Sequence, residues 1–282
     1  MTHIINGDHA GPASGPAATT GWRAGRFLES IAVRRMIVLV VLALVWEIAA
    51  RIQDNPIMLP TFSAAAVAFW DGIWNADLLG AALGSLIVLL KAYFLALAIS
   101  VALVSFAVAN SFLRDALQTV AAMLNPLPAI ALLPLAMLWF GLGEASLLFV
   151  LVNAVIWPFA LAALSGFESV PETQRLVGRN YGLKGPAYVW YILIPSALPS
   201  LISGLRIGWA FAWRTLIAAE LVFGVNSGQG GLGWFIFRAR NELFTDTVFA
   251  GLATVILIGL LVEAVVFRGI ESATVRRWGV MR

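Results

Sequence analysis

Long apolar runs separated by short polar breaks make up most of the chain. Several runs approach or exceed the ~20 residues that an α-helix needs to cross a bilayer. They do not alternate between apolar and polar positions as the strands of a membrane β-barrel would, and the run ALAISVALVSFAVA at 96–109 is an example. The pattern predicts an all-α polytopic membrane protein with six transmembrane helices, at about 31–50, 79–109, 116–140, 145–167, 198–225 and 248–267.

Prolines and tryptophans add detail to this topology. Pro126, Pro128 and Pro134 fall inside the third predicted span, and because proline lacks the backbone N–H, they should bend it. Between the first two spans, Trp70 and Trp74 recur at helical spacing among acidic and amide side chains. This spacing is typical of a helix lying in the interface at the outer face of the membrane, with its indoles at headgroup level.

The charges predict an orientation for the six spans. Charged residues are only 12% of the 282 residues and hydrophobic residues 61%, against about 25% and roughly 45–50% in soluble domains. Lys and Arg are enriched in cytoplasmic loops, and a cytoplasmic N-terminus leaves only Arg51, Arg238 and Arg240 outside. Both termini are therefore predicted in the cytoplasm. The basic residues predicted on the cytoplasmic side are Arg23, Arg26, Arg34, Arg35, Arg114, Arg175, Arg179, Lys184, Arg268, Arg276, Arg277 and Arg282.

Glu47 lies four residues before Arg51, the spacing of a helical ion pair.

The residue inventory argues against an enzyme or a metal site. The chain has no cysteine, and its two histidines, His3 and His9, lie in a leader rich in Gly, Pro, Ala and Thr. Because the usual nucleophile–base pairs and metal-ligand clusters are missing, we expect no catalytic residue and no metal. The leader has the composition of a disordered tail. We divide the chain into this cytoplasmic tail at 1–30, a first transmembrane helix at 31–54, a core of five helices at 55–270 with a soluble-side loop at 168–196, and a cytoplasmic tail at 271–282.

The sequence offers no phosphate loop for ATP. Such a loop needs glycine immediately before a lysine, whereas the only lysines, Lys91 and Lys184, each follow leucine. The segment 228–233 formally matches GxGxxG but follows a membrane span, so we interpret it as a tight outer loop and not as a dinucleotide site. We therefore expect no cofactor in this chain, and ATP-driven work would require a partner chain.

Two pairs of glycines stand four residues apart within apolar runs. They are Gly80 with Gly84, and Gly204 with Gly208. This spacing places both glycines of a pair on one helix face, where it lets two backbones approach closely. We predict close packing within the chain, with a dimer face as the alternative.

Three basic residues lie inside predicted spans: Lys91, Arg206 and Arg214. Each costs about 2.5–3.5 kcal/mol at mid-span, so each should face a cavity, a partner charge or an interface. Guanidinium groups bind oxyanions bidentately, and Arg214 is followed toward the outer end by Glu220 and preceded by Trp213. One interpretation is an anion pathway containing all five residues, in which Glu220 gates or merely caps. The alternative is structural, with Arg206 reaching the cytoplasmic surface.

The soluble-side loop has the pattern of a docking surface. Pro171 can start a short helix, glycines at 182 and 185 interrupt it, and an aromatic stretch then ends at Pro195. A short exposed helix of this kind suits insertion into a groove of another protein. The alternative is a plain cytoplasmic connector.

The same loop resembles the signature loop of permeases of ATP-binding-cassette importers, which reads EAA, three residues, G, nine residues, I-x-L-P. Gly182 is followed after nine residues by Ile192, and Pro195 closes the motif, with Ile194 in place of its leucine. The triplet falls on Leu176, Val177 and Gly178. The resemblance assigns coupling to the ATPase to Leu176, Val177, Gly178, Arg179, Gly182, Leu183, Lys184, Ile192, Ile194 and Pro195.

Other stretches are similar to the nitrate, sulfonate and taurine branch of this family. They are 124–135, 138–144, 197–206, 213–220 and the Gly-Leu-Gly at 231–233. In the second span Ser85 fits the branch, while the arginine common there three positions later is Val88, which Lys91 could replace. In order, the stretches cover about residues 55–270.

The resemblance implies a permease subunit of an ATP-driven importer in a bacterial inner membrane. It implies a homodimer of permeases, a pair of ATPase subunits that hold ATP and Mg and dock at the loop, and a periplasmic binding protein that delivers the solute. Membrane lipid is a further expected partner, and nucleic acid is not. The solute class is a small anion such as a sulfonate, nitrate or a carboxylate. A self-sufficient secondary transporter or channel for a small anion is the alternative, and an intramembrane enzyme is disfavoured by the residue inventory.

Overall fold

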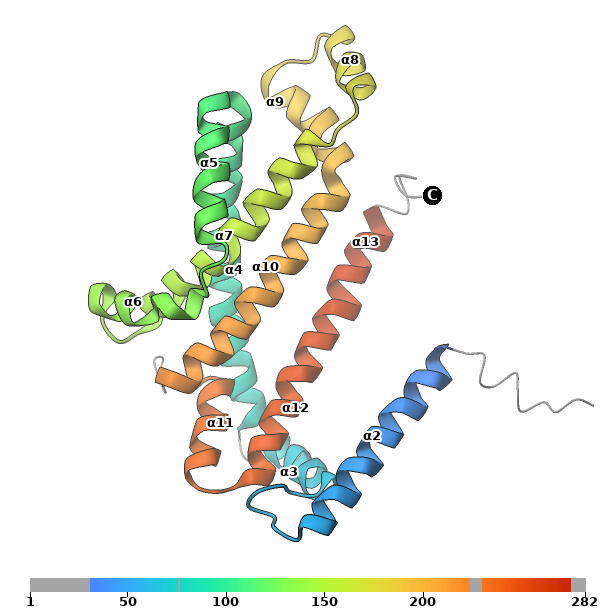
Figure 1. The fold of residues 1–282 in the computed structure, drawn as a ribbon, viewed down its shortest axis with the longest axis vertical. Helices are drawn as coiled ribbons and strands as arrows, with labels where there is room; N and C mark the ends of the chain where they lie inside the picture. The colour runs from blue at the N-terminus through green and yellow to red at the C-terminus, as the bar shows by residue number, and fades with distance from the viewer. Residues whose placement is uncertain (1–30, 76, 224–229, 275–282) are drawn as a thin grey trace, which may run out of the picture.

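The computed structural model describes residues 31–75, 77–223 and 230–274 (Figure 1). Within these ranges every regular element is a helix. Five helices are long and apolar enough to cross a membrane, and a sixth crossing results if one pair bent by 89° is counted as one span. The predicted all-α polytopic class is confirmed. The predictions for the tail at 1–30, for the first two residues of the GxGxxG segment and for the end of the C-terminal tail fall outside the described residues.

The helices follow one another with short connections. The three elements labelled η are short departures from α-helical geometry. In chain order the elements are α2 (Ile31–Gln53), α3 (Phe62–Trp74), α4 (Leu78–Ala109), α5 (Ser111–Leu124), η1 (Ala129–Leu132), α6 (Leu133–Phe140), α7 (Glu144–Glu168), α8 (Glu172–Asn180), α9 (Gly185–Tyr188), η2 (Val189–Leu193), α10 (Ile194–Phe223), α11 (Leu232–Asn241), α12 (Thr245–Leu261), η3 (Val262–Phe267) and α13 (Arg268–Thr274).

The core lies where α7 packs against α10 and α4. Leu89 of α4, Leu151 of α7 and Leu216 of α10 are fully buried there. A Cβ on Gly204 would come within 2.7 Å of the Ala162 Cβ, so α10 approaches α7 too closely for a larger residue at 204. The predicted packing of the 204/208 glycine pair within the chain is thus confirmed, whereas Gly80 faces the side chain of Asp77 in its own helix turn.

The bend predicted in the third span, 116–140, is confirmed, although the span consists of separate helical segments and not of one continuous helix. The chain forms α5 from Ser111 and then breaks before η1 and α6, which run at 89° to α5. Pro126 and Pro128 lie in the break, where their missing N–H groups cannot continue the helical ladder. Pro134 is in the first turn of α6, a position at which no N–H is needed.

Near the fifth span the helix begins earlier than predicted. The helical segment suitable for a membrane runs from Gly185 to Val222, whereas the pattern predicted a start at 198. Pro195 lies in the first turn of α10, and the preceding η2 is π-helical, with the Ile194 N–H donating to the Val189 carbonyl. The wider turn accommodates a proline that cannot donate to the ladder.

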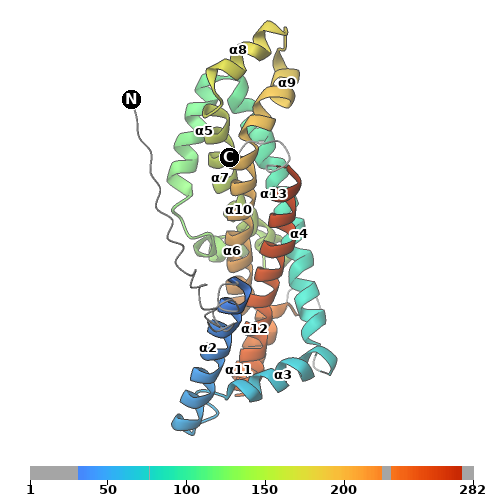
Figure 2. The ribbon, with the colours of Figure 1, turned by 90° about the vertical axis from the view of Figure 1, so that its right-hand side faces the viewer.

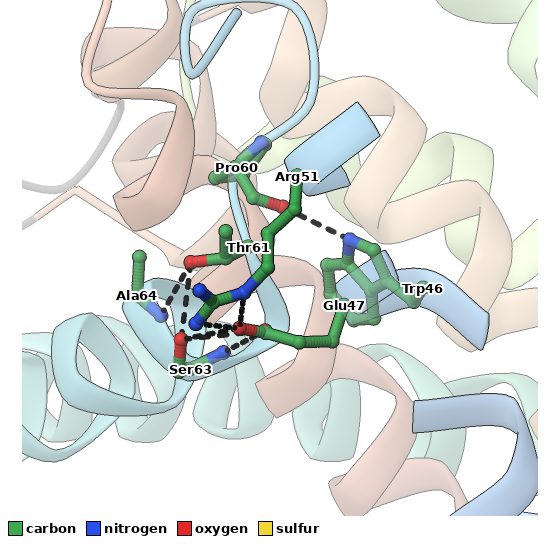
Figure 3. A network of polar contacts seen from close by, with 7 residues as sticks. All are labelled: Trp46, Glu47, Arg51, Pro60, Thr61, Ser63 and Ala64. Carbon is green, nitrogen blue, oxygen red and sulfur yellow. Dashed lines mark hydrogen bonds and ion pairs between the residues drawn. The ribbon is translucent and has the colours of Figure 1, made fainter. Parts of the chain in front are cut away.

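The first helix leans away from the bundle and joins it through a polar network at α3 (Figures 1 and 2). Figure 3 shows the network. Glu47 accepts from Arg51 at 2.8 Å, which confirms the predicted ion pair, and from the Ser63 N–H at 3.1 Å. The Trp46 indole donates to the Pro60 carbonyl at 3.0 Å. Beyond the network, α3 runs across one end of the bundle, and the exposure of its tryptophans fits the interfacial helix, which stays a prediction.

Candidate functional site

The loop predicted to couple to an ATPase forms a hairpin of short helices at the end of the molecule opposite α3 and α11 (Figures 1 and 2). Its two elements, α8 and α9, are joined by a turn in which Gly182 has φ +73° and Gly185 has φ +56°. Glycine adopts such angles without the steric cost that other residues meet. The Leu183 N–H donates to the Gly178 carbonyl at 3.0 Å and closes the end of α8.

The triplet positions divide between packing and exposure. A Cβ on Gly178 would lie 2.8 Å from Ile192 Cγ1 and 3.0 Å from Tyr188 Cε2, so α8 rests directly on the aromatic segment there. Leu176 and Val177 are about half exposed, at 48% and 49%. A small residue is therefore required at the third position, while the first two present apolar side chains to the surroundings.

Polar contacts attach α8 to both neighbouring long helices. The Arg175 guanidinium donates to the Phe167 carbonyl at 2.6 Å and to the Val170 carbonyl at 3.1 Å, which satisfies backbone acceptors at the end of α7. On the other side the Ser196 hydroxyl of α10 donates to Gln174 Oε1 at 2.6 Å. The loop is thereby tied to α7 and α10, so that a force on α8 would be transmitted to both.

The remaining predicted coupling residues occupy the turn and the start of α10. Arg179 lies 4.0 Å from Glu172, with both side chains about two-thirds exposed, a contact that contributes little. Lys184 is exposed just before α9, whereas Leu183, Ile192, Ile194 and Pro195 are partly buried. Their coupling role stays a prediction.

Two of the three basic residues predicted in spans are paired with carboxylates. Lys91 Nζ lies 2.8 Å from Glu144 Oε1, joining α4 to the start of α7. The Arg206 guanidinium lies 3.0 Å from Glu271 and 3.3 Å from Glu263, and it stands over the Phe267 ring at 5.8 Å. Both side chains are neutralised by protein groups, which is how a charge is tolerated in an apolar body.

Glu220 belongs to a buried cluster that closes the end of the core next to α11. Its exposed fraction is 5%, and Ser85 is fully buried beside it. The Ser85 hydroxyl lies 2.8 Å from both carboxylate oxygens, and the Gly233 N–H donates to Glu220 Oε2 at 2.8 Å. The Leu232 N–H donates to Ser85 Oγ at 2.8 Å. The cluster therefore caps the N-terminus of α11 and links it to α4 and α10.

Arg214 stands apart from these pairs. Among the residues that the structure describes, none makes a hydrogen bond or ion pair with its side chain, which is exposed. It lines a cavity of about 400 Å³ between α7, α10 and the break at 125–130, together with Asn125, Asn153 and Thr215. Trp213, its neighbour in sequence, is instead buried against α12, close to Gly259. The five predicted pathway residues are thus not brought together.

The same cavity contains a second donor without an acceptor. The Trp157 indole lines it, and the Nε1 atom of Trp157 is buried with no hydrogen-bond partner in the described part of the chain. Sequence reasoning missed Trp157, Asn125, Asn153 and Thr215, although a lone Asn inside the apolar run of α7 is a signal that a search for polar residues in spans could have used. A guanidinium and neighbouring amide and hydroxyl donors form an arrangement that can bind an anion.

No cluster suited to a metal is present among the described residues. No group of three or more Asp, Glu, His or Cys side chains is placed to hold an ion there. The geometry instead defines a helical membrane body with a cavity at Arg214 between long helices and an exposed loop that presents Leu176 and Val177.

This chain belongs to the family of binding-protein-dependent transport system inner membrane components, whose model matches residues 95–268, more than half of the chain. It is therefore a multi-pass membrane transport permease of an ATP-binding-cassette system, and not an enzyme. It is 32% identical to the taurine transport system permease protein of Escherichia coli (strain K12) over 231 residues, which are 80% of this chain and 82% of that protein.

Two further relatives extend the comparison. A putative ABC transporter permease protein of Methanocaldococcus jannaschii is 30% identical, over 78% of this chain and 82% of that protein. The nitrate import permease protein of Synechocystis sp. is 33% identical, over 55% of this chain and 54% of that protein. The resemblance to the nitrate, sulfonate and taurine branch is confirmed.

Proposed function

We propose that this permease is the membrane subunit of an ATP-driven importer for a small oxyanion or related acid, which passes the Arg214 cavity. The observation that carries the proposal is the contrast among the basic residues of the spans. Lys91 and Arg206 each have carboxylate partners, whereas Arg214 has none among the described residues and lines a polar cavity. An uncompensated cation at this depth is costly unless water or an anion accompanies it.

The relatives support the solute class. The solutes in the names of related permeases are taurine, nitrate, aliphatic sulfonates and bicarbonate. These solutes share a planar or tetrahedral acid group whose oxygens can accept two parallel N–H donors from a guanidinium. The Arg214 cavity, with Asn153 and Thr215 beside it, offers that chemistry without specifying the rest of the solute.

The driving force would come from partner chains. In the proposed assembly two copies of the permease face each other, ATPase subunits with ATP and Mg dock at the α8–α9 loop in the cytoplasm, and a soluble binding protein delivers the anion at the opposite face. Support comes from the exposed Leu176 and Val177 and from the attachment of α8 to α7 and α10. Movement of the loop would reorient both helices, and α7 and α10 are the helices that line the Arg214 cavity.

The test is uptake into proteoliposomes containing the permease, its ATPase and its binding protein. R214Q should weaken uptake of the transported anion by roughly 10- to 100-fold, the effect of losing one charged hydrogen-bonding partner. R268Q is the matched control, because Arg268 is exposed and lies outside the cavity. Unchanged uptake by R214Q would remove Arg214 from the pathway. Transport by the permease alone, without ATP, would replace the importer with the secondary transporter or channel.

A further inference from the structure

A second cavity lies beside the coupling loop, and the proposed transport path does not use it. Its volume is about 710 Å³, and it is bounded by α4, α5, α7, α8, α9, η2 and α10. Most of the lining is apolar and includes Val104, Val108, Phe159, Leu164, Leu193 and Leu201. The size lies within the range of sites that enclose a small molecule or a substantial part of a larger one.

The polar groups of this cavity gather at its end near the loop. Arg114, Glu168 and Arg175 are the charged residues of the lining, which leaves one net positive charge. Gln118 donates to Glu168 at 2.8 Å, and Arg175 donates to two backbone carbonyls. Arg114 has no side-chain partner among the described residues and is partly exposed, so its guanidinium is available to an anionic ligand.

A buried hydroxyl at the same end also lacks a partner. Tyr188 lines the cavity, and its OH is buried without a hydrogen bond to any described group. This hydroxyl is enclosed by protein, and the Tyr188 ring packs on Gly178 of α8, so the part of Tyr188 that a ligand in the cavity would contact is apolar. The cavity thus combines an apolar body with a cationic end.

We propose that this cavity binds an anionic phospholipid, with its phosphate at Arg114 and an acyl chain along the apolar wall. The inference rests on the proposed orientation, which places the loop and Arg114 at the cytoplasmic face. Basic pockets between transmembrane helices on that face are suited to anionic headgroups. Because Tyr188, Val189 and Leu193 form one wall, a bound lipid would brace the segment on which α8 rests.

The headgroup is tested with one pair of arginine variants. Native mass spectrometry of the full chain in detergent would count retained phosphatidylglycerol and phosphatidylcholine with the same acyl chains. The wild type should retain phosphatidylglycerol in preference. R114Q should lower that retention about fivefold, the effect of one basic residue at an anionic membrane surface. R268Q, which removes an exposed charge outside the cavity, should not.

The acyl chain is tested with one pair of phenylalanine variants. S105F would fill the cavity from an exposed position of its lining and should lower retention of both lipids, whereas A102F, an exposed neighbour outside the lining, should leave retention unchanged. Equal retention by R114Q and R268Q, or by S105F and A102F, would overturn the proposal. Displacement by soluble glycerol 3-phosphate would identify a free-phosphate site instead. Lipid retention is measured without ATP and without uptake. A negative result in this experiment would therefore leave the proposed transport function unaffected.

Discussion

Replacing Ser85 by alanine tests whether the Glu220 cluster holds α11 to α4 and α10. The Ser85 hydroxyl is a donor to the Glu220 carboxylate and an acceptor from the Leu232 N–H, each at 2.8 Å. S85A leaves both groups buried without that partner, and each such loss costs about 1–3 kcal/mol. The expected loss in the free energy of unfolding is therefore roughly 2–6 kcal/mol.

Ser100 supplies a control in the same helix. It is as fully buried as Ser85, but its hydroxyl makes only a 3.4 Å contact with the Ile156 carbonyl. S100A removes the same atom and should cost only about 0.5–1 kcal/mol. Heating the purified chain in one detergent and following tryptophan fluorescence should place the Tm of S85A roughly 2–20 °C below that of S100A, since the two losses differ by about 1–5 kcal/mol and each kcal/mol lowers the Tm by about 2–4 °C.

Two outcomes would refute this reasoning. Equal Tm values for S85A and S100A would mean that the cluster contributes nothing beyond an ordinary buried hydroxyl. Fully additive effects in the double variant S85A/E220A would mean that the two side chains do not act on each other. We expect a double variant less damaged than the sum, because removing Glu220 also removes the carboxylate that S85A leaves unpaired.

Two further predictions concern the loop and the Lys91–Glu144 ion pair. G182A should strain the α8–α9 turn by roughly 1–2 kcal/mol, because alanine adopts φ +73° unfavourably although no atom lies near its Cβ. The ratio of transported anion to hydrolysed ATP should therefore fall in G182A and stay unchanged in G269A, which changes the helical α13. An unaltered ratio in both variants would show that the turn takes no part in coupling. K91Q should lower the Tm more than the double variant K91Q/E144Q does, because the single change leaves the Glu144 carboxylate without the cation that lies 2.8 Å away. A lower Tm for the double variant than for K91Q would contradict the pairing.

The helices were predictable to the extent that lipid imposes them. A backbone in hydrocarbon must satisfy its own hydrogen bonds, so a long apolar run has few alternatives to a helix. The break after α5 was predicted as a bend, but its angle of 89° was not. The prolines show that the helical hydrogen bonds are interrupted, but they do not determine the direction in which the next helix packs. The early start of α10 was missed because Pro195 was interpreted as the end of the loop, whereas it lies in the first turn of the helix, where no N–H is needed.

The side-chain pairs were beyond the reach of spacing rules. Glu47 and Arg51, four residues apart, were predicted and are observed. Lys91 and Glu144 are separated by 53 residues, and Ser85 and Glu220 by 135. Such pairs depend on which helix faces pack together in the fold. The spacing of residues within one helix does not determine how distant helices pack. Hence the cost of a charge in a span could be predicted from the sequence, whereas the group that offsets it could not.

The structure turns that cost into an argument about function. Of the basic residues at 91, 206 and 214, the first two have carboxylates from distant segments within 3.3 Å, so their charges are accounted for by the fold alone. The same fold supplies no carboxylate for Arg214 among the described residues, although it places three uncharged polar side chains beside it. Uncharged donors and a free guanidinium stabilise an anion that comes and goes, whereas a fixed carboxylate would compete with it. The absence of a described acidic partner is therefore what a transient anion site requires, and R214E, which supplies a fixed negative charge in the cavity, should abolish uptake more completely than R214Q.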